Sequence, residues 1–236
     1  MRIRDKIKKP QRPVVAYEIL PPREKDGTLN SYAETISSLL SQTHIDAINI
    51  PEVHDEAGRG ERPVANHKRG EPREFGLLLQ DIVGIEAIVN RVVVHKKFEV
   101  QKNWIEKTNK KYEIENLIIV GGESSSISYL GPTVNQVLEY IKYSYNEIYG
   151  NVFSGCIAIP SRKNESQNLL KKSQNGAEFF TTQVLYDSNN IIKMINNYQS
   201  LCNENKTFPR RILLSFAPVS SQKNINFLKW FGVEIP

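Results

Sequence analysis

Short apolar runs alternate with longer amphipathic segments along most of the chain. The runs are rich in β-branched residues and end at proline, glycine or polar clusters, which is typical of buried strands. They predict seven strands, at residues 14–20, 46–50, 85–94, 116–120, 152–159, 179–184 and 211–216. The intervening segments place apolar residues at helical spacing and predict helices at residues 29–42, 73–83, 98–112, 133–148, 165–175, 188–204 and 221–231.

This order of strand and helix is typical of a parallel sheet joined by crossover helices. At about 30 residues per unit, a doubly wound sheet and an eight-stranded TIM-type (β/α)8 barrel both agree with it. No Gly-x-Gly-x-x-Gly follows the first strand, which weighs against a dinucleotide-binding fold. We expect one barrel domain over residues 14–236, with the eighth strand missing from this chain. The unpaired edges favour either further C-terminal residues or a homo-oligomer or partner subunit that covers them.

Positive charge is concentrated at the N-terminus. Residues 1–13 hold six basic side chains and one acidic one, out of 31 basic and 26 acidic in the whole chain, so 25 of each sign remain elsewhere. Such a segment is able to meet nucleic acid, which is one alternative for the function. No aromatic side chains interleave with these charges, as stacking on bases requires. A solvated, frayed basic tail with no nucleic-acid partner is therefore the preferred interpretation.

The composition excludes several other classes of protein. No stretch approaches about 18 consecutive apolar residues, and the first ten residues lack the apolar segment of a secretory signal. Cys156 and Cys202 are too few for a disulfide framework or a four-cysteine zinc site. We therefore expect a cytoplasmic protein without a membrane partner.

Candidate chemistry lies where the predicted strands end, because parallel α/β folds bind ligands at the carboxyl ends of their strands. Glu18 lies in an apolar strand, where poor solvation favours a protonated carboxyl able to act as a general acid. The structural alternative is a buried Glu18 paired with Arg23 or another base. Gly121 and Gly122 end the fourth strand and permit a close approach to a ligand or, equally, a tight turn.

Two further features are candidates for the functional site. Gln183 lies near the end of a strand, where its amide can both donate to and accept from a pterin-like ring, or simply satisfy the core. Residues 51–72 form the longest irregular stretch, and this length suggests a cover over the active site. His54, Asp55 and His67 in this stretch match no metal-ligand spacing, so we predict no metal site.

Several segments resemble the methylenetetrahydrofolate reductase family of flavin-dependent barrel enzymes. Tyr17-Glu-Ile-Leu-Pro-Pro-Arg23 resembles the family's first strand, and Gly176-Ala-Glu-Phe-Phe-Thr-Thr-Gln-Val-Leu-Tyr-Asp187 closely resembles a second family segment. Ala217-Pro-Val219 fits the end of the family's seventh strand. The resemblance runs in one order from about residue 14 to residue 236.

This resemblance implies roles for named residues. Glu18 matches the family's catalytic acid, which helps to open the five-membered folate ring at N10, and Gln183 matches a residue that contacts the folate. Glu165, Asn168 and Lys172 match a row that holds flavin adenine dinucleotide (FAD). Their i, i+3, i+7 spacing places them on one helix face, where Glu165 and Asn168 suit ribose hydroxyls and Lys172 suits the diphosphate.

Other positions beside the cofactor depart from the family pattern. Leu130 and Gly131 stand where the family places an aromatic and a small residue. Asn90 stands in place of a His at the third strand, and Gly121-Gly122-Glu123 replaces Arg-Gly-Asp, so that Gly122 and Glu123 match the last two positions. Ile159 replaces a Tyr that the family has after the fifth strand.

The family implies a function in one-carbon metabolism and methionine biosynthesis. We expect an oxidoreductase that uses FAD and NAD(P)H to reduce 5,10-methylenetetrahydrofolate, or a related pterin, to its 5-methyl form. The alternative is a non-catalytic paralogue that binds flavin or pterin as a regulatory or partner subunit. Glu18 favours the enzyme, whereas Asn90, Ile159 and the missing eighth strand favour the paralogue.

Overall fold

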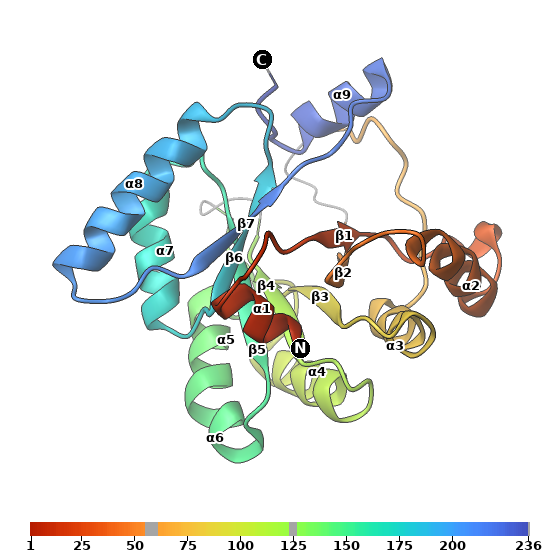
Figure 1. Cartoon of the computed structure of the whole chain (residues 1–236), viewed down its shortest axis with the longest axis horizontal. Helices are drawn as coiled ribbons and strands as arrows, with labels where there is room; N and C mark the ends of the chain where they lie inside the picture. Colours follow the sequence, from red (N-terminus) through yellow and green to blue (C-terminus); the bar gives the residue numbers. More distant parts are fainter. Residues whose placement is uncertain (55–60, 123–126, 236) are drawn as a thin grey trace.

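One sheet of seven parallel strands forms the centre of the molecule (Figure 1). The computed structural model describes residues 1–54, 61–122 and 127–235. The strands are β1 (Ala16–Glu18), β2 (Ala47–Ile50), β3 (Ala87–Val92), β4 (Asn116–Val120), β5 (Phe153–Ala158), β6 (Phe179–Val184) and β7 (Arg211–Ser215), and they pair in chain order. A doubly wound sheet reverses its strand order at a switch point. The sequential order therefore confirms the TIM-type barrel that lacks one strand.

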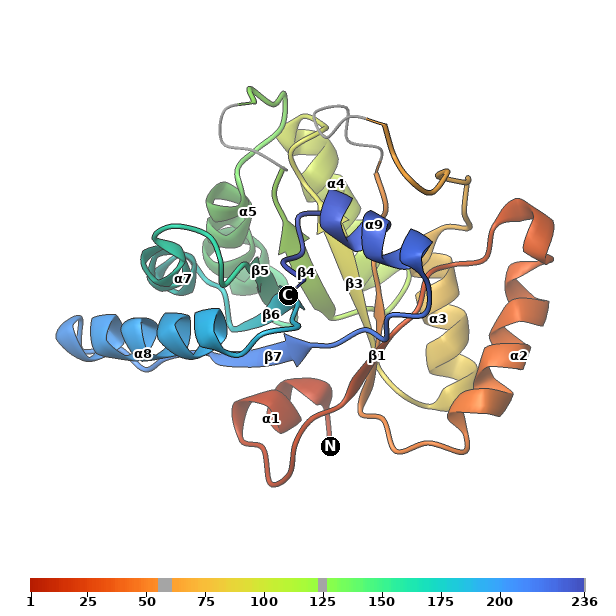
Figure 2. The ribbon, with the colours of Figure 1, turned by 90° about the horizontal axis from the view of Figure 1, so that it is seen from above.

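One helix precedes the first strand, and the others lie between or after the strands and surround the curled sheet (Figure 2). They are α1 (Ile3–Lys8), α2 (Leu29–Leu40), α3 (Pro72–Val83), α4 (Phe98–Lys110), α5 (Val134–Tyr140), α6 (Asn146–Tyr149), α7 (Glu165–Gln174), α8 (Asn189–Glu204) and α9 (Gln222–Trp230). The helix predicted at 133–148 is α5 and α6 joined by a π-helical turn, Ile141–Tyr145. No helix among these described residues is long and apolar enough to cross a membrane.

Local sequence signals explain where the helices begin and end. The Thr28 side chain caps α2 by accepting a hydrogen bond from Ser31 N, and Thr133 and Gln136 form a capping box at the start of α5. Gly84 ends α3 with φ +71°, a left-handed conformation that glycine adopts without strain. The core between helices and sheet then follows from the apolar faces that the sequence pattern predicts.

The basic N-terminal segment is an ordered part of the barrel, so the expectation of a frayed, solvated tail is wrong for residues 3–8. Ile3 and Ile7 are one helical turn apart and both are buried in α1. They pack into an inner core with Ala47, Ile88, Ile118, Phe153 and Phe179, which line the inside of the sheet. The helix therefore closes the amino-terminal end of the barrel.

Ion pairs fasten the same segment to the barrel. Arg2 pairs with Glu115 over 2.9 Å, and Lys6 and Arg12 pair with the buried Asp46 over 3.0 and 2.7 Å. Lys8 pairs with Glu178. Four of the six basic side chains are thus engaged with carboxylates of the barrel, which leaves little of the charge that the nucleic-acid alternative required.

The barrel is open between its first and last strands. Within the described residues, β1 pairs only with β2 and β7 only with β6. Residues 14–20 were expected to be buried, but Val15 and Tyr17 are 44% and 50% exposed, and Leu214 on β7 is 45% exposed. The reason is that a closed barrel would cover both strands, whereas here neither has a neighbour on its outer side. The expectation that another chain covers these edges remains a prediction.

The packing of α1 leads to a first test. Replacing Ile7 by Ala should destabilise the protein by about 2–5 kcal/mol, because the truncation leaves a cavity in the inner core. Chemical unfolding by urea, followed by circular dichroism, measures this loss. Lys9→Ala changes an exposed side chain just beyond the same helix and serves as the control. Equal stability of the two variants would show that α1 does not fasten the barrel.

Candidate active site

The barrel interior has an apolar floor and a polar layer above it. Side chains alternate along a strand, so residues two positions beyond the floor residues Ala16, Ala47, Ile88 and Phe179 face the same interior. The residues at these positions are Glu18, Asn49, Asn90 and Thr181, and Gln183 follows on β6. This polar layer lies toward the carboxyl ends of the strands, where parallel α/β folds bind ligands.

Glu18 ends β1 and lies beside Asn49 in the register of β1 and β2. Asn49 Nδ2 donates a hydrogen bond to Glu18 Oε2 over 2.8 Å. Desolvation by the surrounding barrel raises the pKa of Glu18, while the hydrogen bond from Asn49 acts in the opposite direction. The predicted direction of the shift is confirmed. The side chain nevertheless remains accessible to water, so a ligand in the interior can reach it.

The predicted alternative partner of Glu18 is engaged elsewhere. Arg23 Nε lies 2.7 Å from Asp26 Oδ2, and the pair lies on a short helical turn after β1. Within the described residues Glu18 takes part in no ion pair, so its one hydrogen-bond partner there is an uncharged amide. This arrangement favours a neutral, proton-donating carboxyl.

Glu165, Asn168 and Lys172 share one face of α7, as their spacing predicts. Asn168 Nδ2 donates to Glu165 Oε2 over 3.1 Å, and Lys172 Nζ lies 3.6 Å from Glu165 Oε1. Lys172 also donates to the Ile157 carbonyl over 2.8 Å, and Glu165, which is only 2% exposed, accepts from Ile159 N over 3.1 Å. These hydrogen bonds therefore hold α7 against the end of β5. Both carboxylate oxygens of Glu165 accept from donors of the protein itself.

The segment after β4 presses against the end of β3. A Cβ atom on Gly131 would strike the backbone carbonyls of Val93 and Lys96, and Gly131 N donates to Val94 O over 2.8 Å. Leu130, the neighbouring predicted cofactor contact, is 70% exposed. Only glycine fits the close approach at position 131, so this loop is held at the mouth of the barrel.

The other predicted residues after β4 are less completely placed. A Cβ atom on Gly122 would strike the ring of Tyr129, so packing against this ring also favours glycine at position 122. Glu123 lies outside the described residues, as does Asp55 from the stretch at 51–72. Asn90 on β3 is buried, and its Oδ1 has no hydrogen-bond partner in the described part of the chain.

Gln183 joins the sheet to the last helix. Its Nε2 donates to the Phe231 carbonyl over 3.1 Å, just past the end of α9. The Arg62 guanidinium lies over the rings of Phe227 and Trp230, 5.4 and 5.5 Å from their centroids. The described end of the stretch at 51–72 therefore reaches α9 on the carboxyl side of the barrel, as a cover over the site would (Figure 1).

The sequence reasoning missed a network at the rim. Glu52 follows β2 and accepts hydrogen bonds from Arg91 Nη1 over 2.6 Å and Val92 N over 2.8 Å. Burial acts to raise the pKa of Glu52, but the His54 hydrogen bond and the Arg91 charge hold it below its ordinary value. The signal was available, because Glu52 directly follows the strand-ending Pro51. Within the described residues no group of side chains is arranged to hold a metal ion.

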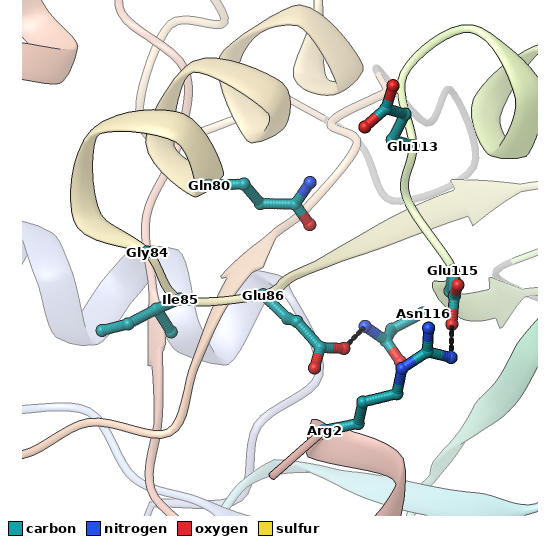
Figure 3. A pocket seen from close by; sticks show the side chains of 8 residues that line it. All are labelled: Arg2, Gln80, Gly84, Ile85, Glu86, Glu113, Glu115 and Asn116. Carbon is teal, nitrogen blue, oxygen red and sulfur yellow. Dashed lines mark hydrogen bonds and ion pairs between the residues drawn. The ribbon is translucent and has the colours of Figure 1, made fainter.

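Two cavities lie at opposite ends of the barrel. One of about 410 Å³ lies at the rim beside Glu52 and is also lined by Pro21, Pro51, His67, Arg69 and Gly70. The other, of about 340 Å³, lies beside α1 at the amino-terminal end, where Arg2 pairs with Glu115 and Asn116 donates to Glu86 (Figure 3). The first adjoins the carboxyl ends of the strands, so it belongs with the candidate site, together with smaller cavities lined by Gln183 and by Asn90.

Comparison with known proteins agrees with this geometry. The model of the family described as methylenetetrahydrofolate reductase matches residues 2–236. The chain belongs to the methylenetetrahydrofolate reductase family. A search of curated proteins finds no match.

Solved structures show the same fold as this family member. An uncharacterized protein from Clostridium thermocellum, which binds two copies of 5-methyl-5,6,7,8-tetrahydrofolic acid, is 18% identical, with 99% of this chain and 76% of that chain covered and a TM-score of 0.75. Oxaloacetate acetylhydrolase in complex with an inhibitor is 9% identical, with coverage of 98% and 76% and a TM-score of 0.54. A putative dihydrodipicolinate synthetase from Pseudomonas aeruginosa is 13% identical, with coverage of 85% and 70% and a TM-score of 0.51.

The raised pKa of Glu18 in this family member predicts a pH-dependent effect on stability. The folded protein binds the proton more tightly than the unfolded chain, so stability is fully present below the ordinary pKa of 4.5 and is lost as the pH rises through the folded pKa. Glu18→Gln removes this loss. The variant should therefore gain stability relative to the parent at pH 7 but not at pH 4, as measured by urea unfolding.

The matched control is Glu34→Gln, which removes a carboxylate from the exposed face of α2. It reports the effect of taking away one surface charge. A difference between Glu18→Gln and the parent that is the same at both pH values would show that burial does not disfavour the charged form of Glu18.

Proposed function

We propose that this chain is a flavin-dependent reductase that converts 5,10-methylenetetrahydrofolate, or a related pterin, to its 5-methyl form with NAD(P)H. The observation that carries the proposal is Glu18, a carboxyl of raised pKa in the polar layer of a barrel of this family. The folate-binding neighbour of similar fold supports a folate ligand. The reaction needs a proton donor near the nitrogen that leaves when the five-membered ring opens.

Glu18 supplies that proton in the proposed mechanism. Its neutral form donates to N10 as the ring opens, and Asn49 holds the carboxyl in place through the 2.8 Å hydrogen bond. Gln183, already fixed to Phe231 at the end of α9, orients the folate beside it. The contact of Arg62 with α9 helps to exclude water from the mouth while the proton moves.

The residues near α7 fit the flavin in part. Both oxygens of Glu165 are engaged by the protein, so we assign ribose and diphosphate contacts to Asn168 and Lys172, with Glu165 positioning both. In the interior, the unpartnered Asn90 Oδ1 faces the polar layer, and we assign it to the folate ring and not to the flavin. When bound, FAD supplies the transfer of hydride between the nicotinamide and the methylene carbon.

A second function is favoured by specific substitutions. Asn90 and Ile159 replace the His and Tyr that the family usually places near the flavin. These substitutions suit a paralogue that binds flavin or pterin as a partner subunit without turnover. Separate measurement of the two half-reactions distinguishes it from the enzyme.

Glu18→Gln provides that measurement. Gln keeps the shape and the hydrogen bond but has no proton to deliver, which typically lowers a rate by about 10²–10⁴-fold. Bleaching of the flavin by NADH or NADPH needs no proton at N10 and should proceed near the parent's rate. Reoxidation by methylenetetrahydrofolate should collapse, and stopped-flow absorbance follows each step.

The other outcomes point to different conclusions. Equal slowing of both half-reactions means that Glu18 has a structural role. If neither step slows, Glu18 is not the acid. A parent protein that binds folate but never reoxidises with it supports the partner-subunit function.

Lys172→Ala tests the proposed flavin contact. The ammonium is the one charge of the row that can balance a diphosphate, so its loss should weaken FAD binding at least tenfold in equilibrium dialysis. Lys171→Ala, on the exposed face of the same helix turn, is the control. Retention of flavin by both variants to the same extent would place the diphosphate elsewhere.

A further inference from the structure

Asn49 occupies a position that the family resemblance did not assign. It lies beside Glu18 on the neighbouring strand, and its Nδ2 donates to Glu18 Oε2. Its Oδ1 is buried and has no hydrogen-bond partner in the described part of the protein. One end of the amide is therefore held by Glu18, and the other is an unused acceptor.

Asn90 repeats this feature on the next strand. Asn49 is in register with Ile88, and Asn90 lies two residues further on the same face, one step nearer the carboxyl ends. Asn90 is 7% exposed, and its Oδ1 is likewise without a partner among the described residues. Two buried amide oxygens on adjacent strands thus face the interior that Glu18 faces.

A buried acceptor without a partner has given up its hydrogen bonds to water. The described residues hold other such oxygens on Asn135, Asn151 and Asn224, but Asn49 and Asn90 are the two that share the polar layer. The oxygens of Asn49 and Asn90 lie in the polar layer, where a ligand would lie. Both residues belong to strands of the sheet, so their backbones are held in place. A ligand that brings N–H donors to this layer would restore both hydrogen bonds. A ligand edge made of carbonyl oxygens would instead meet acceptors with acceptors.

We propose that Asn49 is both a positioning residue for Glu18 and, with Asn90, an acceptor for ring N–H or amino groups of the ligand. The chemical class of that ligand is a nitrogen heterocycle with a donor edge, as in an amino-substituted pterin. This inference rests on the proposed function for the identity of the ligand. It adds the residues that orient the ring and hold the acid.

The orientation follows from the way in which the amide is used. Turning the Asn49 amide to exchange Oδ1 for Nδ2 would break the hydrogen bond to Glu18, so that hydrogen bond keeps Oδ1 as the acceptor in its present place. Ligand binding at Asn49 Oδ1 and the position of the Glu18 carboxyl therefore depend on the same side chain. A ligand whose ring donates to Asn49 Oδ1 is therefore held in the same interior as the Glu18 carboxyl.

Asn49→Leu tests both roles because leucine has a similar volume and no amide. In the ligand-free protein, carbon-13 NMR of the Glu18 carboxyl should show titration at higher pH than in the parent, since the donor that favours the charged form is gone. Isothermal titration calorimetry with 5-methyltetrahydrofolate should show at least tenfold weaker binding. Asn197→Leu, on the exposed face of α8, should change neither quantity.

Two outcomes overturn the inference. An unchanged titration of Glu18 removes the positioning role, and unchanged affinity removes the acceptor role. Should circular dichroism show that Asn49→Leu does not fold, Asn49→Ser, which has no group long enough to replace the amide, is measured in the same way. If the parent itself binds no folate, the proposed function fails, and the Glu18 titration still decides whether Asn49 positions the acid.

Discussion

The packing of α1 against the inner core determines what the rest of the barrel can do. Ile3 and Ile7 fill the amino-terminal end, and Arg4 and Lys8 lie over the Phe153 ring, 5.4 and 5.3 Å from its centroid. Without this helix the interior would open to water at both ends. With it, the interior has an apolar floor, and the polar residues are confined to the carboxyl side, where a ligand meets them from one direction.

Two carboxylates, the partly buried Glu52 and the buried Glu165, brace the carboxyl end of the barrel on two sides of the sheet. Glu52 accepts a hydrogen bond from Val92 N and pairs with Arg91, which joins β2 to β3. Glu165 accepts from Ile159 N and lies beside Lys172, which joins the end of β5 to α7. In each case a side-chain carboxylate accepts a hydrogen bond from a backbone N–H at the end of a strand. Such contacts make the rim rigid enough to position the side chains that line the mouth.

Much of the fold was predictable because its signals are local. The strands at residues 116–120 and 179–184 have the predicted bounds. The first ends where Gly121 interrupts its apolar run, and the second begins directly after the charged Glu178. The N-terminal helix was missed because six charges concealed the spacing of Ile3 and Ile7. Within the site, Glu18 stands out from its own strand, but its partner Asn49 does not. Their contact depends on the register of two strands, which no local pattern specifies.

The pKa of Glu18 is set by burial and by an uncharged neighbour. The polar layer holds this carboxyl, the amides of Asn49, Asn90 and Gln183, and the hydroxyl of Thr181. A cation beside Glu18 would favour its charged form, but within the described residues Glu18 has no ion-pair partner. Desolvation therefore raises its pKa against the single hydrogen bond from Asn49. The interior thus favours the protonated acid by means of amides and hydroxyls, which are also groups that can bind a ligand.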